Sequence, residues 1–277
     1  MYELPEVETV RRDLERELVG KKVKIVTAES MRCLHRYNNR KSFTAQLEGT
    51  KITGVSREGL FITIGLDADS LLVIDLGSTA SLRRATNKAR VDDGTEVVIT
   101  FTQHGQLRFV DSEGTGEMFV VDADSLAGEV PEIEVYGIDP VNEPMSWTSF
   151  GRLLLERSVK LKTLLTDPTF VIGIGPIYAD EILFHAGLRH DRDSDTLSSQ
   201  EIRRLHRSLV GTLHDALKYR GTSLPERPFV DPFGNPGSYA DHLEVWGRDG
   251  ELSSRSRLPI KKVKFQGSPT YYCDTQV

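Results

Sequence analysis

The stretch KTLLTDPTFVIGIGPIYADEILFHAGL, residues 162–188, is the most informative part of this 277-residue sequence. Gly173 and Gly175 allow tight turns just before a segment whose apolar residues have helical spacing. The N–H groups of a first helical turn have no partner inside the helix, and they favour an anion such as phosphate. The glycines could equally do no more than shape a corner between two helices, and this stretch alone leaves both interpretations open.

Helical spacing continues on both sides of this stretch. We expect a helix over residues 199–220, with Ser198 or Ser199 as its N-cap and Glu201 in its first turn. The same periodicity predicts a leading helix near the start of the chain. The other predicted helices cover residues 6–19, 147–157, 161–166 and 176–186.

Between the leading helix and residue 122, the pattern changes to short alternating segments separated by turn residues. Such segments are typical of an antiparallel sandwich or barrel. We therefore predict an α+β fold: an N-terminal antiparallel β-sandwich domain (1–128), a linker (129–145), a helical domain (146–240) and a hairpin (241–277). The predicted strands are residues 22–28, 43–47, 51–57, 60–66, 71–76, 96–101, 107–111 and 118–122.

The composition favours a folded, soluble, cytoplasmic protein. Hydrophobic residues make up 38% of the chain, and the longest apolar runs are far short of the ~20 residues of a membrane-spanning helix. The first fifteen residues lack the apolar region of a signal peptide. Cys33 and Cys273 are too few for a disulfide framework or a complete zinc site. The net charge of −6 weighs against nucleic-acid binding.

Three stretches occur in a distinctive order: YELPEVETVRRDLE at the N-terminus, the central stretch, and VWGRDGE near the C-terminus. Together they resemble the formamidopyrimidine/endonuclease VIII family of DNA glycosylases over essentially the whole chain. The resemblance implies a helix–two-turn–helix domain, a zinc-finger hairpin, and damaged DNA bound for base excision repair. The DNA-binding residues that we predict from it are Lys162, Gly173, Gly175 and Tyr178.

The expected nucleophile is missing. In the family, a proline exposed by removal of the initiator methionine attacks the sugar C1′ and forms a Schiff base. Tyr2 stands at that position here, so the free amine would belong to Met1. Glu3 matches the family's acid/base carboxylate, and Glu6 is also kept. Met1, Glu3 and Glu6 are therefore the candidate catalytic remnant, although both carboxylates could simply favour the first turn of a helix.

Other positions also depart from the family pattern. Leu60 replaces a catalytic lysine, and Pro176 replaces a phosphate-contacting asparagine. Ser78 and Thr115 stand in the two loops that, in the family, fill the gap left in the DNA duplex when the target base is flipped out.

The zinc finger of the family is also altered. The zinc ligands align with Ser253, Ser256, Cys273 and Gln276, which cannot provide the four ligands that zinc needs. We therefore expect no metal or other cofactor, and a zincless finger held by packing of Val263, Phe265 and Tyr271.

These departures predict a monomeric glycosylase-family protein in which base excision is lost or strongly impaired, with weak binding to damaged or abasic DNA. Two alternatives stay open. One is an active DNA glycosylase and abasic-site lyase that uses the Met1 amine. The other is a protein-interaction role without DNA. Residues 85–147 carry 3 basic and 13 acidic residues and should repel phosphate, which together with the missing nucleophile motivates the leading prediction. We expect no membrane association, and a nucleoid location if DNA is bound.

Overall fold

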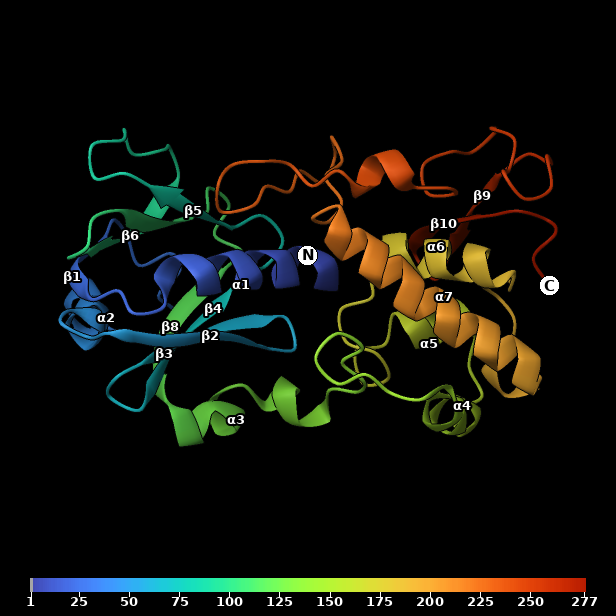
Figure 1. Cartoon of the computed structure of the whole chain (residues 1–277), viewed down its shortest axis with the longest axis horizontal. Helices are drawn as coiled ribbons and strands as arrows, with labels where there is room; N and C mark the ends of the chain where they lie inside the picture. The colour runs from blue at the N-terminus through green and yellow to red at the C-terminus, as the bar shows by residue number, and fades with distance from the viewer. Residues whose placement is uncertain (1) are drawn as a thin grey trace. The chain divides into compact units, whose positions relative to one another are not determined.

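The computed structural model describes residues 2–277. The chain folds into two compact units. Unit 1 contains the chain up to residue 134 together with residues 220–237. Unit 2 contains residues 135–219 and 238–277. Helices and antiparallel strands of both units are drawn in Figure 1, and the predicted α+β class is confirmed.

Unit 1 begins with helix α1, Leu4–Leu18. Glu3 is its N-cap, and Pro5 lies in its first turn, where a missing N–H costs nothing. Val7, Val10 and Leu14 line its buried face at helical spacing. The helix contacts strand β2, and Figure 1 shows it running beside that strand.

Two four-stranded antiparallel sheets form the rest of the unit 1 core, so the predicted sandwich is confirmed. Buried apolar side chains from both sheets, such as Val97 and Ile64, belong to one hydrophobic cluster that also includes α1. One sheet has the order β1 (Val23–Ala28), β6 (Thr95–Phe101), β7 (Gln106–Val110), β5 (Ser81–Ala85). The other has the order β2 (Ile52–Glu58), β3 (Phe61–Leu66), β4 (Ser70–Asp75), β8 (Glu117–Asp122).

In unit 1 one local prediction was wrong and one strand was not predicted. The segment 43–47 is part of a helix, α2 (Arg40–Leu47), not a strand. Asn39 caps it by accepting a hydrogen bond from the backbone of Ser42 at 3.0 Å, and only Phe43 and Leu47, four residues apart, are buried. Strand β5 was missed because its sequence, SLRRA, has too few apolar residues to show strand periodicity.

Short helices follow the second sheet: η1 (Ala123–Ser125), α3 (Leu126–Glu129) and η2 (Pro131–Val135). Unit 2 is mainly helical. Its helices are α4 (Trp147–Leu155), α5 (Leu161–Leu165), α6 (Pro176–Ala186), η3 (Ser194–Thr196), α7 (Ser199–Lys218) and η4 (Tyr239–His242). Helix α6 has the predicted bounds, and Ser198 is the N-cap of α7, as expected. In the described residues, every helix is too short or too polar to span a bilayer.

The C-terminal tail of unit 2 ends in a hairpin of β9 (Lys261–Phe265) and β10 (Ser268–Tyr272). The Glu181 carboxylate of α6 accepts backbone N–H groups from three successive residues, Glu244, Val245 and Trp246, at 2.8–2.9 Å. Its neighbour Asp180 accepts the N–H of Tyr271 at 2.8 Å. Two adjacent acidic residues thus attach both the VWG segment and the hairpin to α6.

Candidate functional site

Tyr2 is a core residue of unit 1. Its side chain is 5% exposed, and its ring meets that of Phe229 edge-on at a centroid distance of 5.5 Å. Burial, followed by the nearby Glu6 carboxylate, raises the pKa of Tyr2 to about 12. The phenol therefore stays neutral at physiological pH, and it contributes packing to this end of α1.

Glu3, the candidate acid/base group, is buried beside a cation that was not anticipated. Its carboxylate accepts a hydrogen bond from Nη1 of Arg227 at 2.7 Å, and the two side chains are 3% and 25% exposed. Charge-assisted contacts of this kind are among the stronger hydrogen bonds. Glu3 is therefore engaged by residues 220–237, which belong to the same unit.

Glu6, the second predicted carboxylate, has a structural position. One carboxylate oxygen accepts the backbone N–H of Glu3 at 3.0 Å, and the other accepts the N–H of Thr222 at 2.7 Å. Gly221 makes the second contact possible, because it has a φ of +83° and a Cβ there would lie 2.9 Å from the Glu6 carboxylate. Glu6 thus joins the start of α1 to segment 220–237.

A second ion-pair cluster fixes the same segment farther along α1. Arg220 bonds to Asp13 and, at 2.6 Å, to Asp231, and both carboxylates are almost fully buried. Burial raises the pKa of Asp231, but hydrogen bonds from Asn235 and Arg220 outweigh it and leave the pKa below its ordinary value. Asp231 is therefore held ionised within the segment.

The loops at the predicted wedge positions are joined to each other. The Thr115 hydroxyl accepts the backbone N–H groups of Ser78 and Thr79, both at 3.2 Å. Gly77 packs so closely that a Cβ would lie 2.1 Å from the Thr115 carbonyl oxygen. Leu60, at the position of the family's lysine, packs against the hydrophobic core, as expected for an apolar residue.

The glycine corner of unit 2 has the geometry expected from its sequence. Gly173 has a φ of +66°, and Gly175 is the N-cap of α6, with Pro176 as the first helical residue. A hollow of about 140 Å³ lies beside Pro176, between α5 and the hairpin. Phosphate binding at this corner stays a prediction.

Lys162 is buried rather than presented to solvent. Its ammonium lies 2.7 Å from the Asp180 carboxylate, and it donates to the Pro269 carbonyl at 2.9 Å and the Thr270 hydroxyl at 2.8 Å. The side chain is 3% exposed. Lys162 therefore links α5, α6 and the hairpin, and this arrangement favours a structural role over the predicted phosphate contact.

Tyr178, the last of the predicted DNA-binding residues, is fully buried on α6. Its ring lies 5.7 Å from that of Tyr239. A side chain that is enclosed in this way contributes packing. Its burial gives no support to the predicted contact with DNA.

Comparisons with known proteins agree with this architecture. A model of the formamidopyrimidine-DNA glycosylase N-terminal domain matches residues 1–118, and a model of the H2TH domain of formamidopyrimidine-DNA glycosylase matches residues 136–227. The chain belongs to the formamidopyrimidine-DNA glycosylase family.

Relatives in this family align along the whole chain. Formamidopyrimidine-DNA glycosylase of Pelotomaculum thermopropionicum is 34% identical, with 99% of this chain and 98% of the relative covered. That of Geobacillus kaustophilus is 35% identical, with the same coverage. The Lactococcus lactis Fpg, solved with DNA containing an abasic site, has a TM-score of 0.86 and 30% identity over 98% of this chain and 97% of that chain. Fpg (MutM) of Thermus thermophilus has a TM-score of 0.84, 32% identity, and coverage of 99% and 97%.

The four positions aligned with the family's zinc ligands do not fit zinc. The Ser256 hydroxyl lies 3.0 Å from the Cys273 sulfur, and Gln276 accepts the N–H of Cys273 at 2.7 Å while donating to the Leu188 carbonyl at 2.8 Å. Ser253 is buried nearby. One thiol, two hydroxyls and an amide are poor zinc ligands. In the described part of the chain, no cluster of three or more His, Cys, Asp or Glu residues could hold a metal.

Packing also supports the hairpin of this family member. Tyr271 and Cys273 belong to a cluster with Phe184 and Val245, and the Phe265 ring meets that of His190 at 5.0 Å. Val263, which we expected to take part in the packing, is 36% exposed.

The contribution of residues 220–237 to unit 1 was not predicted from the sequence. Arg227 lies 224 residues from its partner Glu3, and no local pattern signals such a pair. Arg57 was also missed. It is fully buried and donates to Glu8 at 3.2 Å. Met1, the third predicted catalytic residue, lies outside the described residues.

Proposed function

We propose that this chain is a DNA-binding member of its family in which base excision is absent or strongly impaired. The observation that carries the proposal is the burial of Tyr2 against Phe229 at the position of the family's nucleophile. A neutral, enclosed phenol cannot replace an exposed amine in Schiff-base formation. The ion pair of Glu3 with Arg227 supports the same conclusion, because it gives the candidate acid/base group a structural partner.

DNA is the proposed ligand. The Lactococcus lactis Fpg, which is similar to 98% of this chain, was solved with DNA containing an abasic site. A point mutant of that protein was solved with DNA containing Fapy-dG. The glycine corner at the start of α6 supports a phosphate contact, because helix N-termini favour anions. A cytoplasmic or nucleoid location follows from this proposal.

Two other candidates have specific support. A glycosylase or abasic-site lyase could use the amine of Met1, because primary amines form Schiff bases with the C1′ aldehyde of an abasic site. A protein-interaction role without DNA is supported by the acidic residues 85–147, which should repel a phosphate backbone.

A trapping experiment separates these candidates. Purified, mass-verified protein is incubated with DNA containing one abasic site, with borohydride, at low and moderate salt. Undamaged DNA of the same sequence and protein with an acetylated N-terminal amine serve as controls. A salt-sensitive mobility shift without a covalent adduct is the expected result, since phosphate contacts weaken as salt rises.

The other outcomes are equally informative. A covalent adduct that acetylation abolishes would contradict the loss of catalysis and support the Met1 amine as nucleophile. Absence of both adduct and shift would contradict DNA binding and favour the protein-interaction role.

A further inference from the structure

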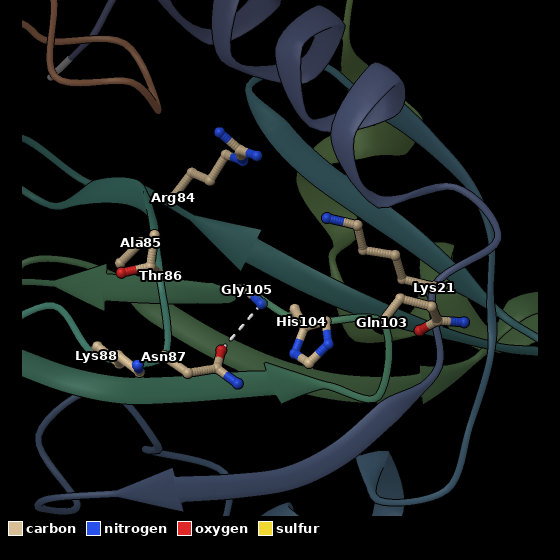
Figure 2. Close-up of a pocket in the computed structure, with 9 residues that line it drawn as sticks. All are labelled: Lys21, Arg84, Ala85, Thr86, Asn87, Lys88, Gln103, His104 and Gly105. Atoms are coloured by element: carbon tan, nitrogen blue, oxygen red, sulfur yellow. Dashed lines mark hydrogen bonds between the residues drawn. The ribbon is translucent and has the colours of Figure 1, made fainter.

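A hollow of about 600 Å³ lies within unit 1 and is not lined by Tyr2, Glu3 or Glu6. Three segments form it: the turn after α1, the end of β5 with the loop that follows, and the tip of the β6–β7 hairpin. Figure 2 shows these segments around the space. The lining residues are Lys21, Arg84, Ala85, Thr86, Asn87, Lys88, Gln103, His104 and Gly105.

Hydrogen bonds join the three segments into a fixed frame. The Gln103 side chain accepts the backbone N–H of Lys22 at 2.9 Å, and Lys22 in turn accepts the N–H of Thr102 at 2.9 Å. The Asn87 side chain accepts the N–H of Gly105 at 2.9 Å, the contact drawn as a dashed line in Figure 2. The walls of the hollow are therefore organised before any ligand binds, which lowers the entropic cost of binding.

The charge of the hollow opposes that of the chain. Lys21, Arg84 and Lys88 line it, and none of its nine lining residues in the described structure is acidic, although the chain carries a net charge of −6. Glu17, which is not a lining residue, pairs with Arg84, its carboxylate lying 2.5 Å from Nε. In Figure 2 the ends of the Arg84 and Lys21 side chains lie on one side of the space, and Lys88 lies beside Asn87 on the other.

This hollow is separate from the candidate catalytic position. Tyr2 and Glu3 precede the first residue of α1, whereas Lys21 follows its last residue, Leu18. A helix of 15 residues is about 22 Å long, so the two ends are well beyond direct contact.

We propose that the hollow binds the phosphate groups of a nucleotide ligand. The lining supplies one guanidinium and two ammonium groups, so its charge stays positive even with Arg84 paired to Glu17, and a positive lining suits a di- or triphosphate. The side-chain amide of Asn87 and the ring of His104 add polar groups at the edge. A volume of about 600 Å³ falls within the usual range for small-molecule sites.

The phosphate group bound in the hollow could belong to a free nucleoside phosphate or to the backbone of a nucleic acid. The proposal does not depend on whether the chain excises bases, because the hollow shares no residue with the Tyr2 and Glu3 position.

Calorimetric titration of the full-length protein with inorganic pyrophosphate at low salt tests the proposal. The test variant is Lys21→Gln/Lys88→Gln, in which Arg84 and its contact with Glu17 remain. The matched control is Lys24→Gln/Lys41→Gln, which removes the same charge from exposed lysines outside the hollow. We expect pyrophosphate affinity to fall about tenfold or more in the test variant, because two charge-assisted contacts are lost, and less than about twofold in the control.

A second titration, with a short single-stranded oligonucleotide, identifies the source. If nucleic acid occupies the hollow, the test variant also weakens oligonucleotide binding, and the slope of log K against log salt becomes shallower by about 1.4. If a free nucleotide is the ligand, only pyrophosphate binding is weakened. Lys88→Glu, on an exposed loop, repeats the test with a single change in case the double variant folds poorly.

Absence of pyrophosphate binding by the unaltered protein would overturn the proposal. Equal losses in the test and control variants would also overturn it, because they would show a general charge effect. Neither result bears on trapping with abasic DNA, so the failure of this proposal is distinguishable from failure of the proposed function.

Discussion

The Tyr2 phenol ring stands where the family resemblance places a reactive amine, and its surroundings explain why it is tolerated there. Phe229 covers the ring, and Arg227 pairs with the adjacent Glu3. The change at Tyr2 and the retention of Glu3 are visible in the sequence. The role of neither residue could be predicted, because both partners come from a segment more than 220 residues away.

Truncating this ring should loosen segment 220–237. Tyr2→Ala removes a buried aromatic side chain, and we expect a loss of about 3 kcal/mol in the free energy of unfolding. Hydrogen exchange of residues 222–229 should quicken in the same variant. Tyr2→Phe is the matched control and should cost less than about 1.5 kcal/mol, since the shape of the ring is kept. Unchanged exchange in Tyr2→Ala would show that the ring does not hold this segment.

Elements with strong end signals were predictable, and weakly patterned ones were not. Helix α6 begins at Pro176 and ends before Gly187, so both limits are visible in the sequence. Helix α2 was misread because two apolar residues, Phe43 and Leu47, do not distinguish a helical spacing from a short strand. Strand β5 pairs only with β7, at the edge of its sheet, where polar residues are common.

The start of α7 should make the stability of unit 2 sensitive to acid. A hydrogen bond from Arg192, followed by contacts with the N-cap Ser198, lowers the pKa of Glu201 to about 2 despite some burial. Because the folded pKa lies below the unfolded value of about 4.5, this stabilisation is complete above pH 4.5 and disappears as the pH falls towards 2. We expect a loss on the order of 1–2 kcal/mol over that range, after allowing for solvent screening.

Unfolding measured from pH 5 to pH 2 checks this expectation. Glu201→Gln should lower stability at pH 5 and flatten its dependence on pH. Asp215→Asn, an exposed change on the same helix, should leave the curve close to that of the unaltered protein. A curve for Glu201→Gln as steep as that of the unaltered protein would assign the acid sensitivity to other groups.

At the scale of the molecule, both units have buried charged contacts at positions where the family resemblance predicted DNA binding or catalysis. In unit 2, Asp180 and Glu181 of the central motif hold the C-terminal tail. The helix within this motif was predictable from the sequence, with the bounds that the structure has. Whether the motif holds the protein together or contacts DNA could not be predicted, because a lysine and glycines before a helix suit either use.

The C-terminal hairpin should be independent of zinc. Its stability should be unchanged by a chelator, because hydrogen bonds among Ser256, Cys273 and Gln276 occupy the region aligned with the zinc ligands. A structural zinc would instead contribute to folding on the order of 10 kcal/mol. Thermal melting with and without EDTA, together with elemental analysis, makes the comparison. A fall in melting temperature that added zinc reverses would contradict the expectation.

The path of the chain limits how this protein can be cut into pieces. It passes from one unit to the other near residues 134, 219 and 237, so neither unit is a continuous stretch. A fragment that ends at residue 134 would lack Phe229, Arg227 and Thr222, and the start of α1 would lose its partners. Dissection by a single proteolytic cut or an early stop codon should therefore yield an incomplete first unit, whereas adding residues 220–237 as a separate peptide should complement it.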